Sequence, residues 1–238
     1  MEKNDYVGMA EFYDMLMTTG DYYNYNNLAQ ELIHLLGEKR HLIELGVGTG
    51  LMAEALIRQI PDLMLTGIDF SSVLLKQARE RLGKVIQLIE EDVLHMNLGL
   101  SFEAAYSSGG VWCLVEMNRE EYWLCSHFPE MDDNFQGLRN VARHLKEGGM
   151  LFLSTQKNHG DKEFNLPNNT VYRQEIKYLE KRRVDKNYFF IQEDAVVAQD
   201  CNRFLLFNVE ETESFLNDCG FKFKAISPQK SFFAYQKV

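Results

Sequence analysis

Three glycines stand at alternate positions directly after an apolar run, in the stretch HLIELGVGTG that begins at His41. They are Gly46, Gly48 and Gly50, and apolar residues at helical spacing follow them. Glycine lets the backbone turn sharply and lets a ligand approach the main chain without meeting a Cβ atom. Exposed N–H groups at a strand-to-helix turn, with the positive end of the helix dipole, favour an anionic or polar ligand group. The stretch therefore predicts a ligand-binding loop.

The spacing of the glycines separates two classes of ligand. A dinucleotide-binding loop has the pattern GxGxxG, which places a small residue where this chain has Leu51. An NAD-dependent oxidoreductase is therefore an alternative that Leu51 and the helical arm before the first strand both oppose. The pattern here, GxGxG, favours a different nucleotide-like ligand.

Three acidic residues follow or end the apolar runs near this loop. Glu44 precedes the first glycine, Asp69 ends the run DLMLTGID, and Asp92 follows VIQLIE. A carboxylate at the position of Asp69 can accept two hydrogen bonds from a ribose diol. The alternative, an acid at the entry of a helix whose N-cap is Ser71, stays open. Glu91 and Asp92 are adjacent, so we expect at most one of them to bind the ligand.

The chain alternates short apolar runs with helical patterns up to Gln156 and then becomes rich in β-forming residues. Alternation of strands and helices builds a parallel sheet with helices on both faces. The later runs have no helices between them, which indicates antiparallel strands. We therefore expect a single domain made of a helical cap, a cofactor-binding core in two segments and a β-rich insertion, at residues 1–39, 40–156 with 209–238, and 157–208.

The segments LIELGVGTG, GIDFSSVLLKQARERL and IEEDVLHMNL resemble motifs I, II and III of the class I S-adenosylmethionine-dependent methyltransferases. Their order and spacing match this family over Leu42–Leu98. The resemblance implies an α/β fold with a Rossmann-like, seven-stranded sheet that is mostly parallel and has an antiparallel terminal strand. It also implies an N-terminal helical arm and a β-rich lid insertion.

The resemblance implies that S-adenosylmethionine is the cofactor and that its parts meet different motifs. Its methionine part would face Glu44 and the glycine loop, and Asp69 would hold the ribose hydroxyls. Phe70 would pack on the adenine, and N-terminal tyrosines would cap the cofactor, although Tyr13 is equally explained as a core aromatic. The cofactor-binding residues expected on this basis are Tyr13, Tyr22, Tyr25, Glu44, Gly46, Gly48, Gly50, Asp69, Phe70, Glu91, Asp92, Val93, Ser107 and Ser108.

Two features favour a small-molecule acceptor over a nucleic acid. The formal net charge is −10, whereas nucleic-acid binding normally depends on a basic surface. The segment SSGGVW lacks the Asn/Asp-Pro-Pro-aromatic motif of enzymes that methylate amino groups of bases. The β-rich insertion resembles the lid sheets of glycine N-methyltransferase and of the amino-sugar N,N-dimethyltransferases, which implies a nitrogen acceptor, with oxygen close behind. Expected pocket residues are Trp112, Tyr172 and Tyr188, each of which core packing also explains.

The sequence identifies no strong catalytic base. A base is required only if the acceptor carries a proton at neutral pH, as a phenol, an alcohol or an ammonium does. His127 and His159 lie in loops that border the expected pocket, and either is also explained as a surface histidine. A cofactor-binding but non-catalytic sensor or partner subunit therefore remains an alternative.

The remaining sequence features concern the compartment. The four cysteines form no CxxC pair and predict neither a metal site nor a disulfide framework. The N-terminus lacks the basic and apolar regions of a signal peptide, and no window approaches the ~20 apolar residues that span a bilayer. We expect a cytoplasmic protein without a membrane or nucleic-acid partner, as a monomer or a homodimer.

Overall fold

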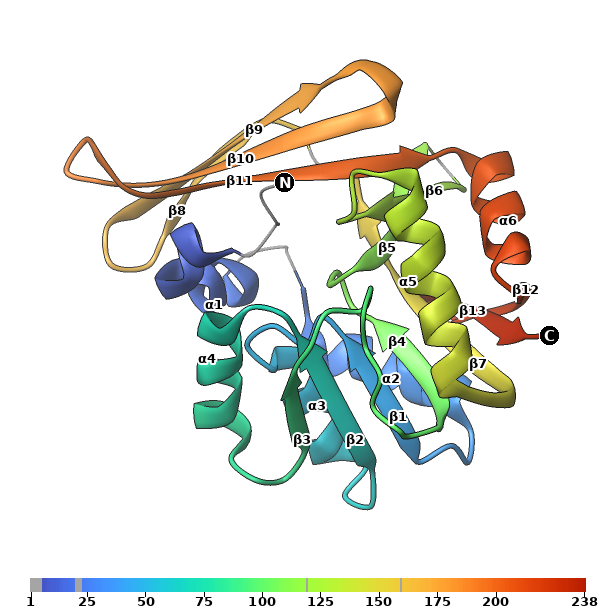
Figure 1. The fold of residues 1–238 in the computed structure, drawn as a ribbon. Helices are drawn as coiled ribbons and strands as arrows, with labels where there is room; N and C mark the ends of the chain where they lie inside the picture. Colours follow the sequence, from blue (N-terminus) through green and yellow to red (C-terminus); the bar gives the residue numbers. More distant parts are fainter. Residues whose placement is uncertain (1–5, 20–22, 119, 159) are drawn as a thin grey trace.

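The computed structural model describes residues 6–19, 23–118, 120–158 and 160–238 (Figure 1). The α-helices are α1 (Ala10–Thr18), α2 (Tyr25–Leu36), α3 (Leu51–Gln59), α4 (Ser72–Leu82), α5 (Met131–His144) and α6 (Val209–Asp218), with short 3-10 helices at Val7–Met9 and Glu180–Arg182. The first strands are β1 (His41–Leu45), β2 (Met64–Asp69), β3 (Gln87–Glu90), β4 (Phe102–Ser107), β5 (Trp112–Asn118) and β6 (Glu121–Ser126). The later strands are β7 (Leu145–Lys157), β8 (Lys162–Leu166), β9 (Thr170–Tyr178), β10 (Arg183–Gln192), β11 (Ala195–Phe207), β12 (Phe221–Ile226) and β13 (Phe232–Lys237).

The expected Rossmann-like α/β class is confirmed. Strands β3, β2, β1, β4 and β7 pair in parallel in that order, and β13 and β12 follow β7 in antiparallel. The strand count differs from the expected seven, because the described sheet continues through further strands to a total of 13. The cause is β7, which pairs with β4 over its first part and with β5 from Thr155 onward.

A hairpin follows β4 and ends just before His127. Strands β5 and β6 form it, and β6 pairs with β11, at Leu205 opposite Ser126. This hairpin joins the parallel core to strands β8–β11, which cross the top of the molecule in Figure 1. Helix α5 stops at His144 and β7 begins at Leu145, so the glycine pair at Gly148 and Gly149 lies within a strand.

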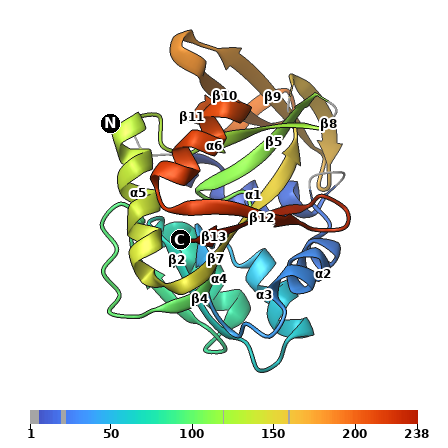
Figure 2. The same cartoon turned by 90° about the vertical axis from the view of Figure 1, so that its right-hand side faces the viewer.

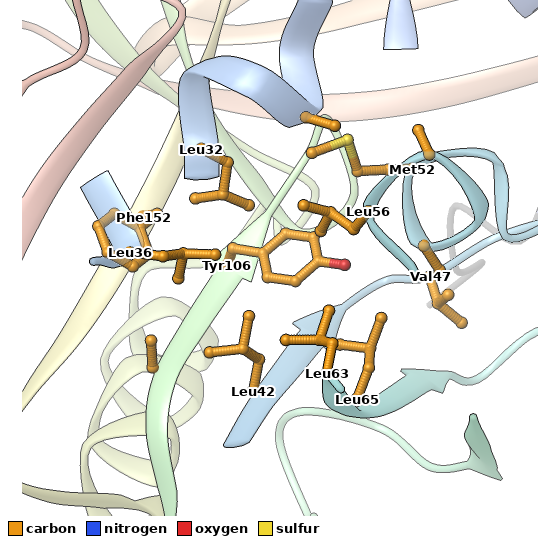
Figure 3. Close-up of a cluster of buried hydrophobic side chains, with 14 of the residues drawn as sticks. Leu32, Leu36, Leu42, Val47, Met52, Leu56, Leu63, Leu65, Tyr106 and Phe152 are labelled. Carbon is orange, nitrogen blue, oxygen red and sulfur yellow. The ribbon is translucent and has the colours of Figure 1, made fainter. Parts of the chain in front are cut away.

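Helices cover both faces of the parallel part of the sheet. Figure 2 shows α5 and α6 on one side and α2 and α3 on the other. Tyr106 on β4 lies in the cluster beneath α2 and α3, with Leu32, Met52 and Leu56 (Figure 3). Because both faces of the sheet are covered, every residue of β1 from Leu42 to Leu45 is buried, the polar Glu44 included.

Helix α1 packs beneath strands β8–β11 and against the parallel core (Figure 1). Its apolar face packs on these strands, where Phe12 stacks on Phe190 with ring centroids 4.6 Å apart. Its polar side holds the glycine loop, because the Thr49 hydroxyl donates a 2.6 Å hydrogen bond to Asp14 and Arg81 forms an ion pair with the same carboxylate. Helix α1 therefore ties strands β8–β11 to the loop after β1.

Membrane-spanning helices and metal-holding clusters are both absent from the part of the chain that the structure describes. None of the described helices combines the length and the apolar content needed to cross a membrane. Among the described side chains, no group of three or more His, Cys, Asp or Glu residues is arranged to hold a metal ion. The four cysteines are free thiols.

Candidate active site

The loop after β1 uses its glycines for two different purposes. Gly46 has a φ of 71°, and a Cβ atom there would lie 2.9 Å from the Cα of Gly110. Gly48 has a φ of 55°, but a Cβ there would meet nothing nearer than the Tyr13 hydroxyl, 4.0 Å away. Gly46 therefore permits two chain segments to touch, while Gly48 leaves its backbone open to a ligand.

Asp69 at the end of β2 is tied to this loop. Its carboxylate accepts hydrogen bonds of 2.8 Å from the backbone N–H groups of Gly48 and Ser71. Burial raises the pKa of Asp69 above its ordinary value, and the backbone hydrogen bonds oppose that rise. Because each carboxylate oxygen has a second lone pair, Asp69 retains the capacity to accept hydrogen bonds from a ligand.

A cavity of about 300 Å³ lies at the carboxyl ends of β1, β2, β3 and β4, where open parallel sheets bind ligands. The structure brings most of the expected cofactor residues together in its wall. Phe70 contributes an aromatic ring, and Asp92 contributes a carboxylate whose Oδ1 also accepts a 2.9 Å hydrogen bond from the backbone of Leu94. The expected residues that line this cavity are Tyr13, Gly46, Gly48, Asp69, Phe70, Glu91, Asp92 and Val93.

Glu44 takes a different position from the one expected. Its side chain does not line the cavity and is 2% exposed, because it shares the strand face of Leu42 rather than that of Leu45. The Tyr106 hydroxyl donates a 2.8 Å hydrogen bond to it. Burial raises the pKa of Glu44 to about 8, and nearby Asp69 adds to the rise.

The other expected cofactor residues divide between the core and a second cavity. Gly50 packs against Leu82 of α4, and Ser107 is fully buried, with its Oγ accepting hydrogen bonds from the backbone of Val111 and Trp112. Neither lines the cavity at the carboxyl ends of β1, β2, β3 and β4. Tyr25 and Ser108 line the second cavity instead. Tyr22 and the candidate base His159 lie outside the described residues.

The second cavity, of about 100 Å³, adjoins the first. The two share four wall residues, Tyr6, Tyr13, Gly109 and His127. Its far wall comes from strands β5, β6, β10 and β11 and is mostly apolar, with Cys113, Val115, Met117, Cys125, Lys186, Tyr188, Phe204 and Leu206. Such a wall suits a small organic ligand.

Two of the three expected pocket aromatics lie in the core instead. Trp112 is fully buried and its indole N–H donates a 2.9 Å hydrogen bond to Asn134. Tyr172 is also fully buried, and its hydroxyl donates to Gln174. Neither ring lines either cavity, because both pack against helices and neighbouring strands. The third expected aromatic, Tyr188, does line the second cavity.

His127 follows β6 and lies between the two cavities. Its ring packs edge-on against Phe204, with centroids 4.7 Å apart, and lies 5.9 Å from the ring of Tyr6. Burial lowers the pKa of His127 to about 3, nearby Lys186 lowers it further, and a hydrogen bond with the Gly109 backbone opposes both. His127 is therefore neutral at physiological pH and a weak proton acceptor.

Lys186 on β10 is the functional candidate that the sequence reading missed. It is only 9% exposed, and its Nζ lies 4.9 Å from the centroid of the Tyr188 ring. Burial lowers the pKa of this amine to about 7, and Lys162 adds to the effect. The sequence does indicate this position, because Lys186 shares the inward face of an alternating strand with Val184 and Tyr188.

Residues 42–149 match the family model described as "Methyltransferase domain". The chain is 28% identical over 137 residues to the uncharacterized methyltransferase YdaC of Bacillus subtilis. The aligned region covers 56% of this chain and 67% of that protein. The chain is 43% identical over 123 residues to trans-aconitate 2-methyltransferase of Rhodopseudomonas palustris, which covers 52% of this chain and 41% of that protein. The chain thus spans less than half the length of the second relative.

Solved methyltransferases share the fold over nearly the whole chain. The CcbJ methyltransferase of Streptomyces caelestis aligns with a TM-score of 0.77 and 16% identity over 100% of both chains. CalS10 of Micromonospora echinaspora, an amino pentose methyltransferase solved with S-adenosylmethionine bound, gives a TM-score of 0.66 and 16% identity over 91% of this chain and 92% of its own. The sugar N-methyltransferase KedS8 of Streptoalloteichus aligns with a TM-score of 0.67 and 16% identity over 94% of this chain and 92% of its own.

Proposed function

We propose that the chain is a class I S-adenosylmethionine-dependent methyltransferase that methylates a nitrogen atom of a small-molecule acceptor. The match of residues 42–149 to the methyltransferase model and the fold shared with solved methyltransferases support this proposal. Oxygen is the second candidate atom. The larger cavity would hold the cofactor and the smaller one the acceptor. The single observation that carries this assignment is the wall that the two cavities share, at Tyr6, Tyr13, Gly109 and His127.

The shared wall matters because methyl transfer needs two ligands in line and in contact. Alignment of the reacting atoms supplies much of the rate in such a reaction, so adjoining sites are a requirement. Tyr6 and Tyr13 meet edge to face, with ring centroids 5.7 Å apart, at the place where the cavities join. These rings would exclude water from the reacting atoms and fix the approach of the acceptor.

The larger cavity fits the cofactor in three ways. Gly48 offers backbone without a Cβ in the way, and the carboxylates of Asp69 and Asp92 offer acceptors for hydroxyl and amino groups. Phe70 offers an aromatic face for a base. When bound, S-adenosylmethionine supplies an electrophilic methyl group on a cationic sulfur. We propose that Asp69 orients the ribose and Asp92 the adenine amino group.

Strands β10 and β11 would act as a lid over the acceptor. Tyr188 and Phe204 on these strands line the smaller cavity, within the insertion at 157–208. The preference for nitrogen draws support from the fold shared with a sugar N-methyltransferase. Oxygen draws support from the relative named trans-aconitate 2-methyltransferase, because trans-aconitate is a carboxylic acid and offers oxygen atoms as acceptors.

The test is methyl transfer over a mixed panel of amines, amino sugars, phenols and carboxylic acids, read as release of S-adenosylhomocysteine. We expect turnover of at least one amine by the wild type, and at limiting cofactor about 10- to 100-fold less by Asp69→Asn. Glu147→Gln, at a carboxylate 89% exposed in its ion pair with Lys237, is the matched control and should retain activity. Binding of S-adenosylhomocysteine without turnover of any panel member would instead favour a non-catalytic sensor.

A further inference from the structure

The acceptor cavity contains little that could neutralise a positively charged acceptor. Among the described residues that line it, none is an Asp or a Glu. An ammonium group entering this wall would lose water without gaining a carboxylate partner, which is costly. A protonated amine is also no nucleophile. The acceptor therefore has to lose its proton in or before this cavity.

We propose that the side-chain amine of Lys186 accepts this proton and so acts as the general base of the reaction. The proposal rests on the proposed function, in which the smaller cavity holds the acceptor. In the step, the N–H or O–H bond of the acceptor breaks and its electron pair stays on the acceptor as the nucleophile. The proton bonds to Nζ and passes to solvent after the product leaves.

The strand register aims Lys186 into the acceptor cavity. On β10 it lies on the same strand face as Val184 and Tyr188, and all three residues line that cavity. It lies opposite Ile176 of β9 and Asn202 of β11, which are both uncharged.

The ionisable groups around Lys186 come from several elements. Lys162 of β8 contributes a positive charge, and Cys113 and Cys125 face it from the hairpin of β5 and β6. Asp200 of β11 lies opposite Tyr188, beside the 3-10 helix at Gly8. Burial of the amine, and then the positive charge of Lys162, lower the pKa of Lys186 and so favour its neutral form, while Cys125 and Cys113 oppose this shift.

The other candidate bases at this cavity are poorly matched to neutral pH. Burial lowers the pKa of His127 to about 3, so it holds a proton too weakly. The pKa of Cys113 is raised well above its ordinary value, first by its hydrogen bond with Cys125, so it stays a thiol. Lys186, with a pKa lowered to about 7, is available in the neutral form and still binds a proton. Lys157 also lines the cavity, but it is exposed.

The first part of the test measures the protonation of Lys186 itself. Competitive acetylation with acetic anhydride, followed by mass spectrometry, gives the pH dependence of each lysine from about pH 5 to about pH 11. We expect a midpoint near 7 for Lys186. A midpoint above about 9 for Lys186 would overturn the proposal, because the amine would then be a cation at neutral pH.

The second part measures methyl transfer to benzylamine, a primary amine whose ring suits the apolar wall. Lys186→Met and Lys186→Arg should lower kcat/KM by about 100-fold and abolish its inflection near neutral pH. The control Lys177→Met, at an exposed lysine of β9 that lines neither cavity, should stay within about twofold of the wild type. A wild-type pH profile in Lys186→Met would contradict the base role. If the wild type leaves benzylamine untouched, the same comparison of variants uses the amine that the mixed panel identifies as a substrate.

A binding control separates this proposal from the proposed function. Calorimetric titration with S-adenosylhomocysteine should give equal affinity for the wild type and Lys186→Met, which also shows that the variant folds. Absence of binding by the wild type would remove the proposed function and leave the acetylation midpoint of Lys186 unaffected.

Discussion

The backbone N–H of Gly48 donates a 2.8 Å hydrogen bond to the Oδ2 atom of Asp69. This bond joins the loop after β1 to the end of β2, at the edge of the sheet where the cofactor cavity lies. The same carboxylate accepts a second hydrogen bond from Ser71, at the start of α4. Asp69 thus organises the cavity before any ligand arrives, in addition to the ligand contact expected of it.

Asp69→Asn should weaken the binding of S-adenosylhomocysteine by about 10- to 100-fold, measured by calorimetry. The amide has only one acceptor oxygen, so one of the two backbone N–H groups would face an NH2 group instead. Glu90→Gln is the matched control, because Glu90 pairs with Asp69 in the sheet but is exposed. Affinity within about twofold of the wild type in Asp69→Asn would show that the carboxylate is not needed.

Gly46→Ala should cost more stability than Gly99→Ala, measured by urea unfolding. Both positions have a positive φ, 71° and 62°, which costs an alanine about 1 kcal/mol. Only at Gly46 would the new Cβ also meet backbone, at 2.9 Å from the Cα of Gly110, whereas nothing lies within 4 Å at Gly99. We expect Gly46→Ala alone to lose S-adenosylhomocysteine binding. Equal losses of stability in the two variants would refute the close contact between the loops.

Glu44→Gln should flatten the dependence of stability on pH. Burial raises the pKa of Glu44 to about 8, so the folded chain binds a proton that the unfolded chain has lost above about pH 4.5. Wild-type stability should therefore fall between about pH 5 and about pH 8. Glutamine does not titrate, and its oxygen can still accept from Tyr106. Thermal unfolding at several pH values tests this, and parallel curves for the two proteins would contradict it.

Lys186→Met should stabilise the folded chain, most strongly at acidic pH. Burial lowers the pKa of Lys186 to about 7, whereas the unfolded value is about 10. Below about pH 7 the folded wild type carries the full cost of a buried cation, and this cost fades as the pH rises toward 10. We expect a Tm gain of about 2–4 °C near pH 6 that shrinks by pH 9. A gain independent of pH would mean that Lys186 does not titrate in this range.

The glycine loop, Asp69 at the end of β2 and Asp92 after β3 were predictable because the sequence pattern that indicates them is local. A strand, a glycine-rich turn and a helix follow one another within HLIELGVGTGLMAEAL, and the motif spacing places Asp69 and Asp92 at the same sheet edge. The N-terminal helix was predictable for the same reason. Its apolar face repeats at helical spacing, and that face packs beneath the lid strands.

Other features depend on which face of a strand is turned inward, and a doubly buried strand does not reveal this. The residues of β1 from Leu42 to Leu45 are all buried, so the sequence could not show that Glu44 points toward Tyr106. Trp112 on β5 was misplaced for the same reason. Lys186 was predictable in principle, since β10 alternates buried and partly exposed residues along its length.

The most direct test of the central claim is a crystal structure of the complex with S-adenosylhomocysteine. The two-cavity account predicts the adenosine between Asp69 and Asp92 and the thioether sulfur at the shared wall, beside Tyr13 and His127. It also predicts that the sulfur faces the cavity that Lys186 lines. A ligand whose sulfur points away from this wall, or one bound elsewhere on the chain, would contradict the account.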